Sequence, residues 1–183
     1  RETVSVIEGE ASFVDDHTVK VVVGDDELVV SAPQIFINTG AESIIPDIPG
    51  VDKPFVYTST ELLDKMTQPK HLAIIGGGYI GLEFASTYTK LGTKVTVFER
   101  GDALLVREDP AIARATTEAL QAQGIEIVFS VDVTAIEGES TATICTAHDD
   151  YAGYDAVLMA TGRRPATMSL NLPAAGVATD ERG

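Results

Sequence analysis

The chain has 183 residues, 44% of them hydrophobic, which is enough for one full domain with a small neighbour and requires no disulfide or metal staple. Its net charge of −15 argues against nucleic acid as a partner, and its single cysteine excludes a disulfide framework and favours a reducing, cytoplasmic setting. No apolar run approaches the ~20 residues that a membrane span requires. The first residue is Arg1 rather than Met, so we expect a piece of a longer chain.

Short strands separated by acidic turns are predicted for the first part of the chain. Apolar and β-branched runs at Glu10–Val14, Val19–Val23 and Leu28–Val30 alternate with Asp-rich turns, which predicts an antiparallel meander. Gln34–Asn38 is predicted as a further strand. The prolines and the glycine within Ile45–Val51 predict a stiff, extended crossing, and we place a domain boundary there.

Helical and strand patterns alternate in the middle of the chain. Thr58 and Glu61 fit a capping box that begins a short helix, which ends before Pro69. Asp109 and Pro110 predict the N-cap and first position of a longer helix. The other predicted elements are a strand His71–Ile75, a helix Tyr79–Leu91, and strands Lys94–Glu99 and Ile125–Phe129. An antiparallel excursion that returns to the sheet is predicted for Val131–Ile136, Ala142–Thr146 and Tyr154–Ala160. This order predicts an α/β fold with a Rossmann-like βαβ sheet and an antiparallel β insert.

A glycine-rich loop follows the predicted strand His71–Ile75 and opens a helix at once. Gly76 permits the tight turn, Gly78 lets a pyrophosphate approach the backbone, and Gly81 lets the helix pack close to the strands. Glu99 ends the next strand, close to the ~20-residue spacing of the dinucleotide fingerprint. The sequence therefore predicts a site for NADH or NADPH.

The choice of nucleotide depends on charges near this loop. Backbone amides at the helix start attract phosphates. The predicted cofactor-binding residues of the loop are therefore Gly77, Tyr79 and Ile80 together with the three glycines of the motif. Glu99 can accept hydrogen bonds from the ribose diol and would repel a 2′-phosphate by about 4 kcal/mol at ~4 Å with an effective dielectric of ~20, which favours NADH. Arg100 and Arg107 can clamp a 2′-phosphate, so NADPH is the alternative.

Tyr79 and Glu83 lie four residues apart and share one face of the predicted helix. Tyr79 is a polar aromatic residue at the helix mouth, where a nicotinamide ring would arrive; packing in the core is its alternative role. Glu83 stands between Leu82 and Phe84, an unusual place for a carboxylate without a partner. The three histidines show no metal-ligand spacing, so no metal site is predicted.

Several segments together resemble the flavin-dependent pyridine nucleotide–disulfide oxidoreductases, which include glutathione reductase, dihydrolipoamide dehydrogenase and mercuric reductase. They are residues 76–83 (GGGYIGLE), 95–100 (VTVFER) and 160–165 (ATGRRP). Residues 38–50 resemble the crossing from the FAD domain to the NAD domain in this family. Residues 107–112 and 162–170 are more similar to the mercuric reductase and reactive-chlorine-resistance branches.

The resemblance implies roles for individual residues. Tyr79 matches the tyrosine that covers the nicotinamide pocket, and Glu83 matches a carboxylate near the flavin–nicotinamide contact, so both are catalytic candidates. Val133 and Gly162 match positions that line the adenine and nicotinamide sides. Thr39, Gly40 and Arg163 would face the FAD of the full-length protein.

The family's FAD-binding glycine loop, redox-active cysteine pair and C-terminal dimer domain have no counterpart in these residues. We therefore expect a partial FAD-domain meander at 1–48, the NAD(P)-binding domain at 49–166, and a tail at 167–183 that returns toward the FAD domain. The parent would be a homodimeric oxidoreductase. This chain would bind nucleotide without turnover, with Cys145 structural. The alternative is a free-standing NAD(H)-binding redox-sensing module; a short-chain dehydrogenase is disfavoured because no Tyr-x-x-x-Lys pair occurs.

Overall fold

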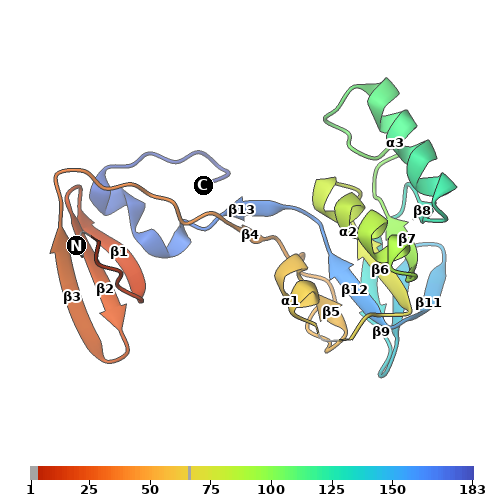
Figure 1. Ribbon diagram of the computed structural model, residues 1–183, viewed down its shortest axis with the longest axis horizontal. Coiled ribbons are helices and arrows are strands. Elements are labelled where there is room, and N and C mark those ends of the chain that lie inside the picture. The colour runs from red at the N-terminus through yellow and green to blue at the C-terminus, as the bar shows by residue number, and fades with distance from the viewer. Residues whose placement is uncertain (1–3, 66) are drawn as a thin grey trace. The chain divides into compact units, whose positions relative to one another are not determined.

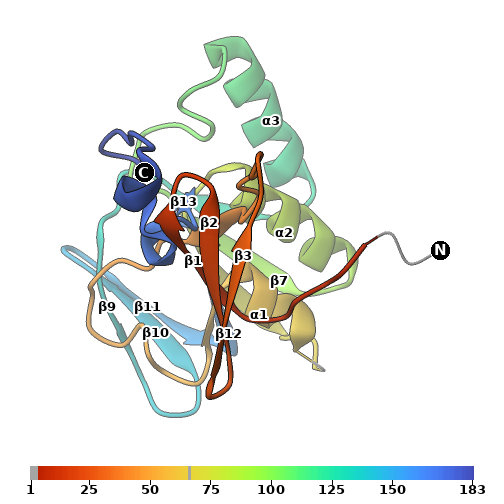
Figure 2. The same cartoon turned by 90° about the vertical axis from the view of Figure 1, so that its left-hand side faces the viewer.

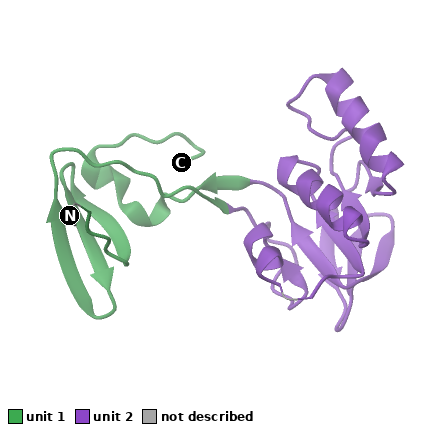
Figure 3. Cartoon of the chain, viewed as in Figure 1, with its two compact units in different colours: residues 1–42, 163–183 green, residues 43–162 purple. Residues whose placement is uncertain are grey.

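The computed structural model describes residues 4–65 and 67–183 (Figure 1). Met66, at the end of the first predicted helix, lies outside the described residues. The chain forms two compact units, residues 1–42 with 163–183, and residues 43–162, which are coloured separately in Figure 3. Two hydrogen bonds join the beginning and the end of the second unit. The Ile44 N–H donates to the Gly162 carbonyl at 3.0 Å, and the Thr161 hydroxyl donates to the Ile44 carbonyl at 2.6 Å.

A five-stranded parallel sheet forms the centre of the second unit. Its order is β5-β12-β6-β7-β8, so β6 and β7, which flank the glycine loop and its helix, are neighbours. The strands are β5 (Val56–Tyr57), β12 (Ala156–Met159), β6 (His71–Ile75), β7 (Lys94–Phe98) and β8 (Glu126–Val128). This is the predicted βαβ arrangement.

The two faces of this sheet pack against different layers, as alternation along β6 shows. Leu72 and Ile74 join the core formed with the helices, whereas Ala73 and Ile75 join the core formed with the antiparallel insert. The helices are α1 (Ser59–Asp64), α2 (Tyr79–Lys90) and α3 (Pro110–Ala122), and the insert is β9 (Val133–Glu137), β10 (Ala142–Thr146) and β11 (Asp150–Tyr154) (Figure 1). The α/β fold with an antiparallel insert is confirmed.

The first unit contains a three-stranded meander in which β2 lies between β1 and β3 (Figure 2). Its strands are β1 (Glu10–Asp15), β2 (Thr18–Val23) and β3 (Asp26–Ser31). Phe13 packs with Leu170 and Leu172 of the 3₁₀ segments Met168–Leu170 and Leu172–Ala175. Two short strands, β4 (Ala41–Ser43) and β13 (Arg163–Pro165), pair with each other.

One strand prediction was wrong, and another was right only in part. Gln34–Asn38 has no strand assignment, because no described strand pairs with it, and Phe36 is 88% exposed. The predicted run Tyr154–Ala160 is two elements: β11 ends at Tyr154, and β12 begins at Ala156 in the parallel sheet. None of the helices in the described residues has the length and apolar character needed to cross a membrane.

Candidate nucleotide-binding site

The turn from β6 into α2 can be formed only by glycine at its first position. Gly76 has φ +111°, and its N–H donates to the Phe98 carbonyl at 2.9 Å. A Cβ at Gly76 would lie 2.4 Å from the Ala160 carbonyl oxygen, well inside van der Waals contact. The turn is therefore held tightly between the ends of β7 and β12.

The two later glycines of the motif have different structural roles. A Cβ at Gly81 would lie 2.2 Å from the Gly76 carbonyl oxygen and 3.2 Å from Ile74, so Gly81 permits close packing of α2 on β6. A Cβ at Gly78 would have no heavy atom within 4 Å. Gly78 thus leaves open space at the mouth of α2.

The first amides of α2 differ from those of the other two helices. Thr58 caps α1 in the predicted capping box, and the Asp109 side chain caps α3, whereas no side chain caps α2 at Gly78. The first bond of α2 runs from Leu82 N–H to the Gly78 carbonyl at 3.0 Å. Within the described part of the chain, the N–H groups of residues 78–81 therefore have no protein acceptor.

The amide of Gly77 is not free, contrary to the prediction of open amides throughout the loop. Its N–H donates to Glu99 Oε2 at 2.7 Å, and Glu99 Oε1 accepts from Gly101 N–H, also at 2.7 Å. Glu99 therefore connects the glycine loop to the loop that follows β7. A carboxylate has about four lone-pair sites, so about two remain for other donors.

Leu104 and Leu105 hold the loop after β7 against the glycine loop. Leu104 is fully buried, and its Cδ2 would lie 2.5 Å from a Cβ at Gly77. Leu105 has φ +50°, which is rare for a non-glycine residue, and its N–H donates to the Gly77 carbonyl at 3.3 Å. Sequence patterns gave no indication of these contacts, which lie outside any helix or strand.

Tyr79 is not a core residue, because 61% of it is exposed. Its hydroxyl donates to Oε1 of Glu108, a residue that sequence reasoning did not single out. This hydrogen bond to a carboxylate raises the pKa of the Tyr79 phenol. Glu83 is also exposed, on the next turn of α2, and has no hydrogen-bond partner among the described residues.

The remaining candidates are divided between the two units. Arg100 and Arg107 are exposed and make no side-chain hydrogen bond or ion pair within the described part. Val133 begins β9 and packs against the insert core, and Gly162 follows β12 with φ +140°. Thr39, Gly40 and Arg163 belong to the first unit, where the Arg163 guanidinium donates to the Ala41 carbonyl.

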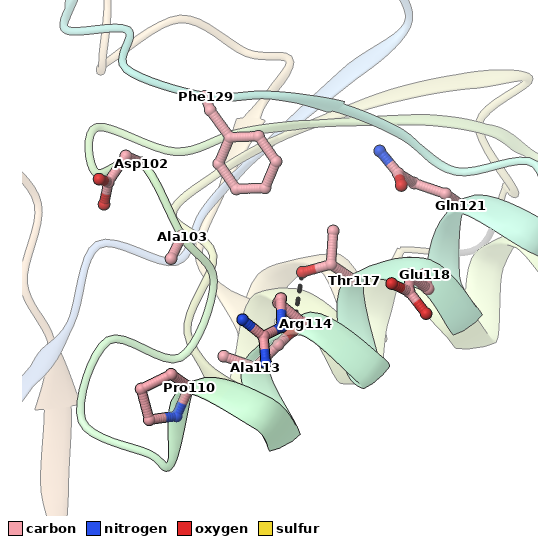
Figure 4. Close-up of a pocket in the computed structure, with 9 residues that line it drawn as sticks. All are labelled: Asp102, Ala103, Pro110, Ala113, Arg114, Thr117, Glu118, Gln121 and Phe129. Atoms are coloured by element: carbon pink, nitrogen blue, oxygen red, sulfur yellow. Dashed lines mark hydrogen bonds between the residues drawn. The ribbon is translucent and has the colours of Figure 1, made fainter.

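A pocket of about 440 Å³ lies between α3 and the segment after β8 (Figure 4). Asp102 and Ala103, which follow Glu99 on the same loop, form part of its wall. Arg114, Thr117 and Gln121 line it from α3, and the ring of Phe129 faces them. The pocket thus lies along the loop that Glu99 connects to the glycine turn.

Cys145 lies half-buried on β10, outside the glycine loop. Burial, followed by the neighbouring Asp150 carboxylate, raises the pKa of the Cys145 thiol, which disfavours the reactive thiolate. Among the described residues, no group of three or more His, Cys, Asp or Glu side chains is arranged to hold a metal ion.

A family model for the pyridine nucleotide-disulphide oxidoreductases matches residues 1–183. The chain belongs to this family. It is 42% identical over 182 residues to the probable pyridine nucleotide-disulfide oxidoreductase RclA of Escherichia coli K12, covering 98% of this chain and 41% of that protein. It is 37% identical over 182 residues to mercuric reductase of Staphylococcus aureus, covering 97% of this chain and 32% of that protein.

A solved structure of this family has the same fold as this chain. The Cu(II) complex of HOCl-induced flavoprotein disulfide reductase RclA from Escherichia coli superimposes with a TM-score of 0.93 at 42% identity, covering 100% of this chain and 42% of that one. The predicted family is confirmed. The chain spans less than half the length of these relatives.

Proposed function

We propose that residues 43–162 are the NAD(P)H-binding domain of a flavin-dependent oxidoreductase. The observation that carries the proposal is the set of N–H groups at residues 78–81, which have no acceptor among the described residues, together with the open space beside Gly78. Such a helix mouth attracts a diphosphate through its free donors and its dipole, equivalent to about half a positive charge. Family membership supports the proposal independently.

NADH is the nucleotide we favour. Glu99 retains free lone pairs at the end of β7, where a ribose diol can donate to it, and its charge repels a 2′-phosphate. The side chains of Arg100 and Arg107, which have no partner among residues 4–65 and 67–183, support NADPH as the second candidate. The pocket between α3 and Phe129 lies along the same loop and offers room for the adenosine end.

Most of the other candidate residues would contact the nicotinamide half of the nucleotide. Tyr79 and Glu83 share the exposed face of the first turns of α2 and would position the ring, while Val133 and Gly162 would line the adenine and nicotinamide sides of the bound nucleotide. A bound reduced nicotinamide supplies a hydride, which in the full-length protein would pass to FAD beside Thr39, Gly40 and Arg163. We also propose a homodimeric, cytoplasmic parent, by analogy with the family.

The 183-residue chain by itself should bind nucleotide without sustained turnover. Its sequence contains one cysteine, Cys145, whereas a dithiol–disulfide cycle needs two. Disulfide reductase chemistry therefore has no electron acceptor within these residues.

Calorimetric titration of the chain with NADH and NADPH tests the proposal. A micromolar complex corresponds to about 8 kcal/mol, and we expect weaker binding than this, with NADH ahead of NADPH. NADH oxidation in the presence of added FAD should stay at the background rate. If millimolar NADH produces no heat and no thermal shift, nucleotide binding is overturned. Sustained oxidation of NADH would overturn the claim of inactivity.

A further inference from the structure

The pocket between α3 and the segment after β8 is built on one face of α3. Arg114, Thr117 and Gln121 stand at positions i, i+3 and i+7 of this helix, so their side chains share a face. The ring of Phe129 lies opposite them (Figure 4). The pocket's volume of about 440 Å³ is in the range of sites that bind small molecules.

The charges of this pocket favour a neutral group over a phosphate. Asp102 and Glu118 each contribute a negative charge and Arg114 contributes one positive charge, so negative charge is in excess. Arg114 and Glu118 are four residues apart on α3, yet they form no ion pair within the described part of the chain. The guanidinium of Arg114 therefore keeps its donors for a ligand.

Thr117 can only accept a hydrogen bond from a ligand. Its hydroxyl donates to the Ala113 carbonyl at 2.8 Å, as Figure 4 shows, so its hydrogen is already in use. The lone pairs of the oxygen stay available, whereas the Arg114 guanidinium has donors and no acceptor. Neighbouring turns of α3 thus present one fixed acceptor and one fixed donor. The Gln121 amide has both and can adapt to either kind of ligand group.

We propose that Thr117 and Arg114 read the edge of the adenine base while Phe129 stacks on its ring, so that the domain selects adenine over hypoxanthine. The inference rests on the proposed nucleotide-binding function. The edge of adenine carries an amino donor beside a ring-nitrogen acceptor, which match Thr117 and Arg114 respectively. Hypoxanthine has a carbonyl oxygen in place of the amino group, so Thr117 would face another acceptor.

Calorimetric titration of the 183-residue chain with NADH and with its hypoxanthine analogue measures this selection. We expect NADH to bind about five- to thirtyfold more tightly, the ratio that corresponds to about 1–2 kcal/mol for matched contacts to a base edge. Thr117→Val removes the acceptor and Arg114→Met removes the donors, so each should bring the two affinities closer together. Thr117→Ser keeps the hydroxyl and should retain the preference.

The stacking contact has a separate signature. Base–aromatic stacking does not depend on the amino group, so Phe129→Leu should weaken the binding of both dinucleotides by the same factor. Phe129 also packs against the larger core of the unit, and leucine keeps an apolar side chain there. Circular dichroism checks that this variant is folded.

A matched control makes the same chemical change beside the pocket. Thr116 is the neighbour of Thr117 on α3 and is not one of the residues that line the pocket. Thr116→Val should therefore keep the full preference for NADH. Loss of the preference in Thr116→Val as well would assign the effect to damage of the helix and overturn base reading by Thr117.

The outcomes separate base reading from nucleotide binding. A preference for NADH that is lost in Thr117→Val and Arg114→Met and kept in Thr117→Ser supports the proposal. If the unaltered chain binds both dinucleotides equally, or if the preference survives Thr117→Val and Arg114→Met, base reading is overturned and nucleotide binding stands. If neither dinucleotide binds to any variant, the proposed function fails and base reading fails with it.

Discussion

The carboxylate of Glu99 joins two loops that carry the candidate site. Its oxygens accept the N–H groups of Gly77 and Gly101, each at 2.7 Å. Gly77 is buried, so its amide would have no acceptor if this side chain were lost. Hydrogen bonds to a charged acceptor are the stronger kind, which makes Glu99 a structural residue as well as a candidate ligand of the ribose.

We expect Glu99→Ala to lower the free energy of unfolding by about 1–3 kcal/mol, the usual effect of leaving a buried donor unpaired. Urea denaturation followed by circular dichroism measures this change. Glu83→Ala is the control, because Glu83 is exposed and unpaired within the described residues; it should change stability by no more than about 0.5 kcal/mol. Equal losses in the two variants would contradict this role of Glu99.

His71 holds a buried ring nitrogen that prefers to stay uncharged. Nδ1 lies 3.2 Å from the Gly153 carbonyl, which can only accept, so Nδ1 carries the hydrogen and Nε2 is left buried without a partner among the described residues. Burial first, and then the charge of Lys94, lower the pKa of His71 below its ordinary value of 6.5. The unfolded chain therefore takes up this proton before the folded chain does.

Stability should consequently fall as the pH drops from about 6.5 through the lower folded-state pKa of His71, and should be fully present above that range. Thermal melts between about pH 7.5 and pH 5.5 measure the trend, at pH values above the range in which carboxylates titrate. His71→Phe, which keeps an aromatic ring against Tyr154, should reduce the change of melting temperature with pH. An unchanged slope in that variant would assign the pH dependence to other groups.

The mouth of α2 combines tight packing with open space within four residues. Gly81 faces a backbone oxygen at 2.2 Å from its hypothetical Cβ, whereas Gly78 faces nothing within 4 Å. The same chemical change, glycine to alanine, should therefore affect stability at Gly81 and nucleotide binding at Gly78.

Gly81→Ala should destabilise the chain by about 1–3 kcal/mol, the range for forcing atoms into a packed region. Gly78→Ala should change stability by less than about 1 kcal/mol, because the poorer N-cap and the reduced entropy of the unfolded chain offset each other. It should weaken NADH binding, since its methyl group enters the space that a diphosphate needs. Thermal melts and calorimetry on both variants test this pair; a stable Gly81→Ala would contradict the packing argument.

Elements with local chemical signals were predictable, and those that depend on distant partners were not. The capping box at Thr58 and the proline after Asp109 predict the helix starts, and the continuous apolar run in His71–Ile75 predicts a buried strand. Gln34–Asn38 has the composition of a strand but no described neighbour to pair with. The Tyr79–Glu108 bond joins residues 29 positions apart across an irregular loop, where no periodicity applies.

At the scale of the molecule, each unit has a core of its own. Every residue of the two larger hydrophobic clusters lies within 43–162, and the smaller cluster around Phe13, Leu170 and Leu172 lies within the other unit. The candidate nucleotide site draws on the second unit alone. Its glycine loop, Glu99 and Glu108 are all contained in residues 43–162.

Residues 43–162 alone should therefore fold cooperatively and bind NADH with the affinity of the whole chain. In the whole chain, the unit with the smaller core should unfold at the lower urea concentration, because less apolar surface is buried there. Urea titration with two probes, and calorimetry on the 43–162 piece, measure these results. Loss of binding in a folded 43–162 piece would show that the other unit contributes to the site.

The most direct test of the account follows the amide signals of residues 76–82 by ¹⁵N–¹H NMR during titration with NADH. Free donors that dock a diphosphate should shift strongly, so we expect the largest changes at residues 78–81. Gly76 should shift less, because its N–H is already bonded to the Phe98 carbonyl. Saturable changes centred on residues 78–81 would support the site, and binding that leaves these four signals in place would contradict it.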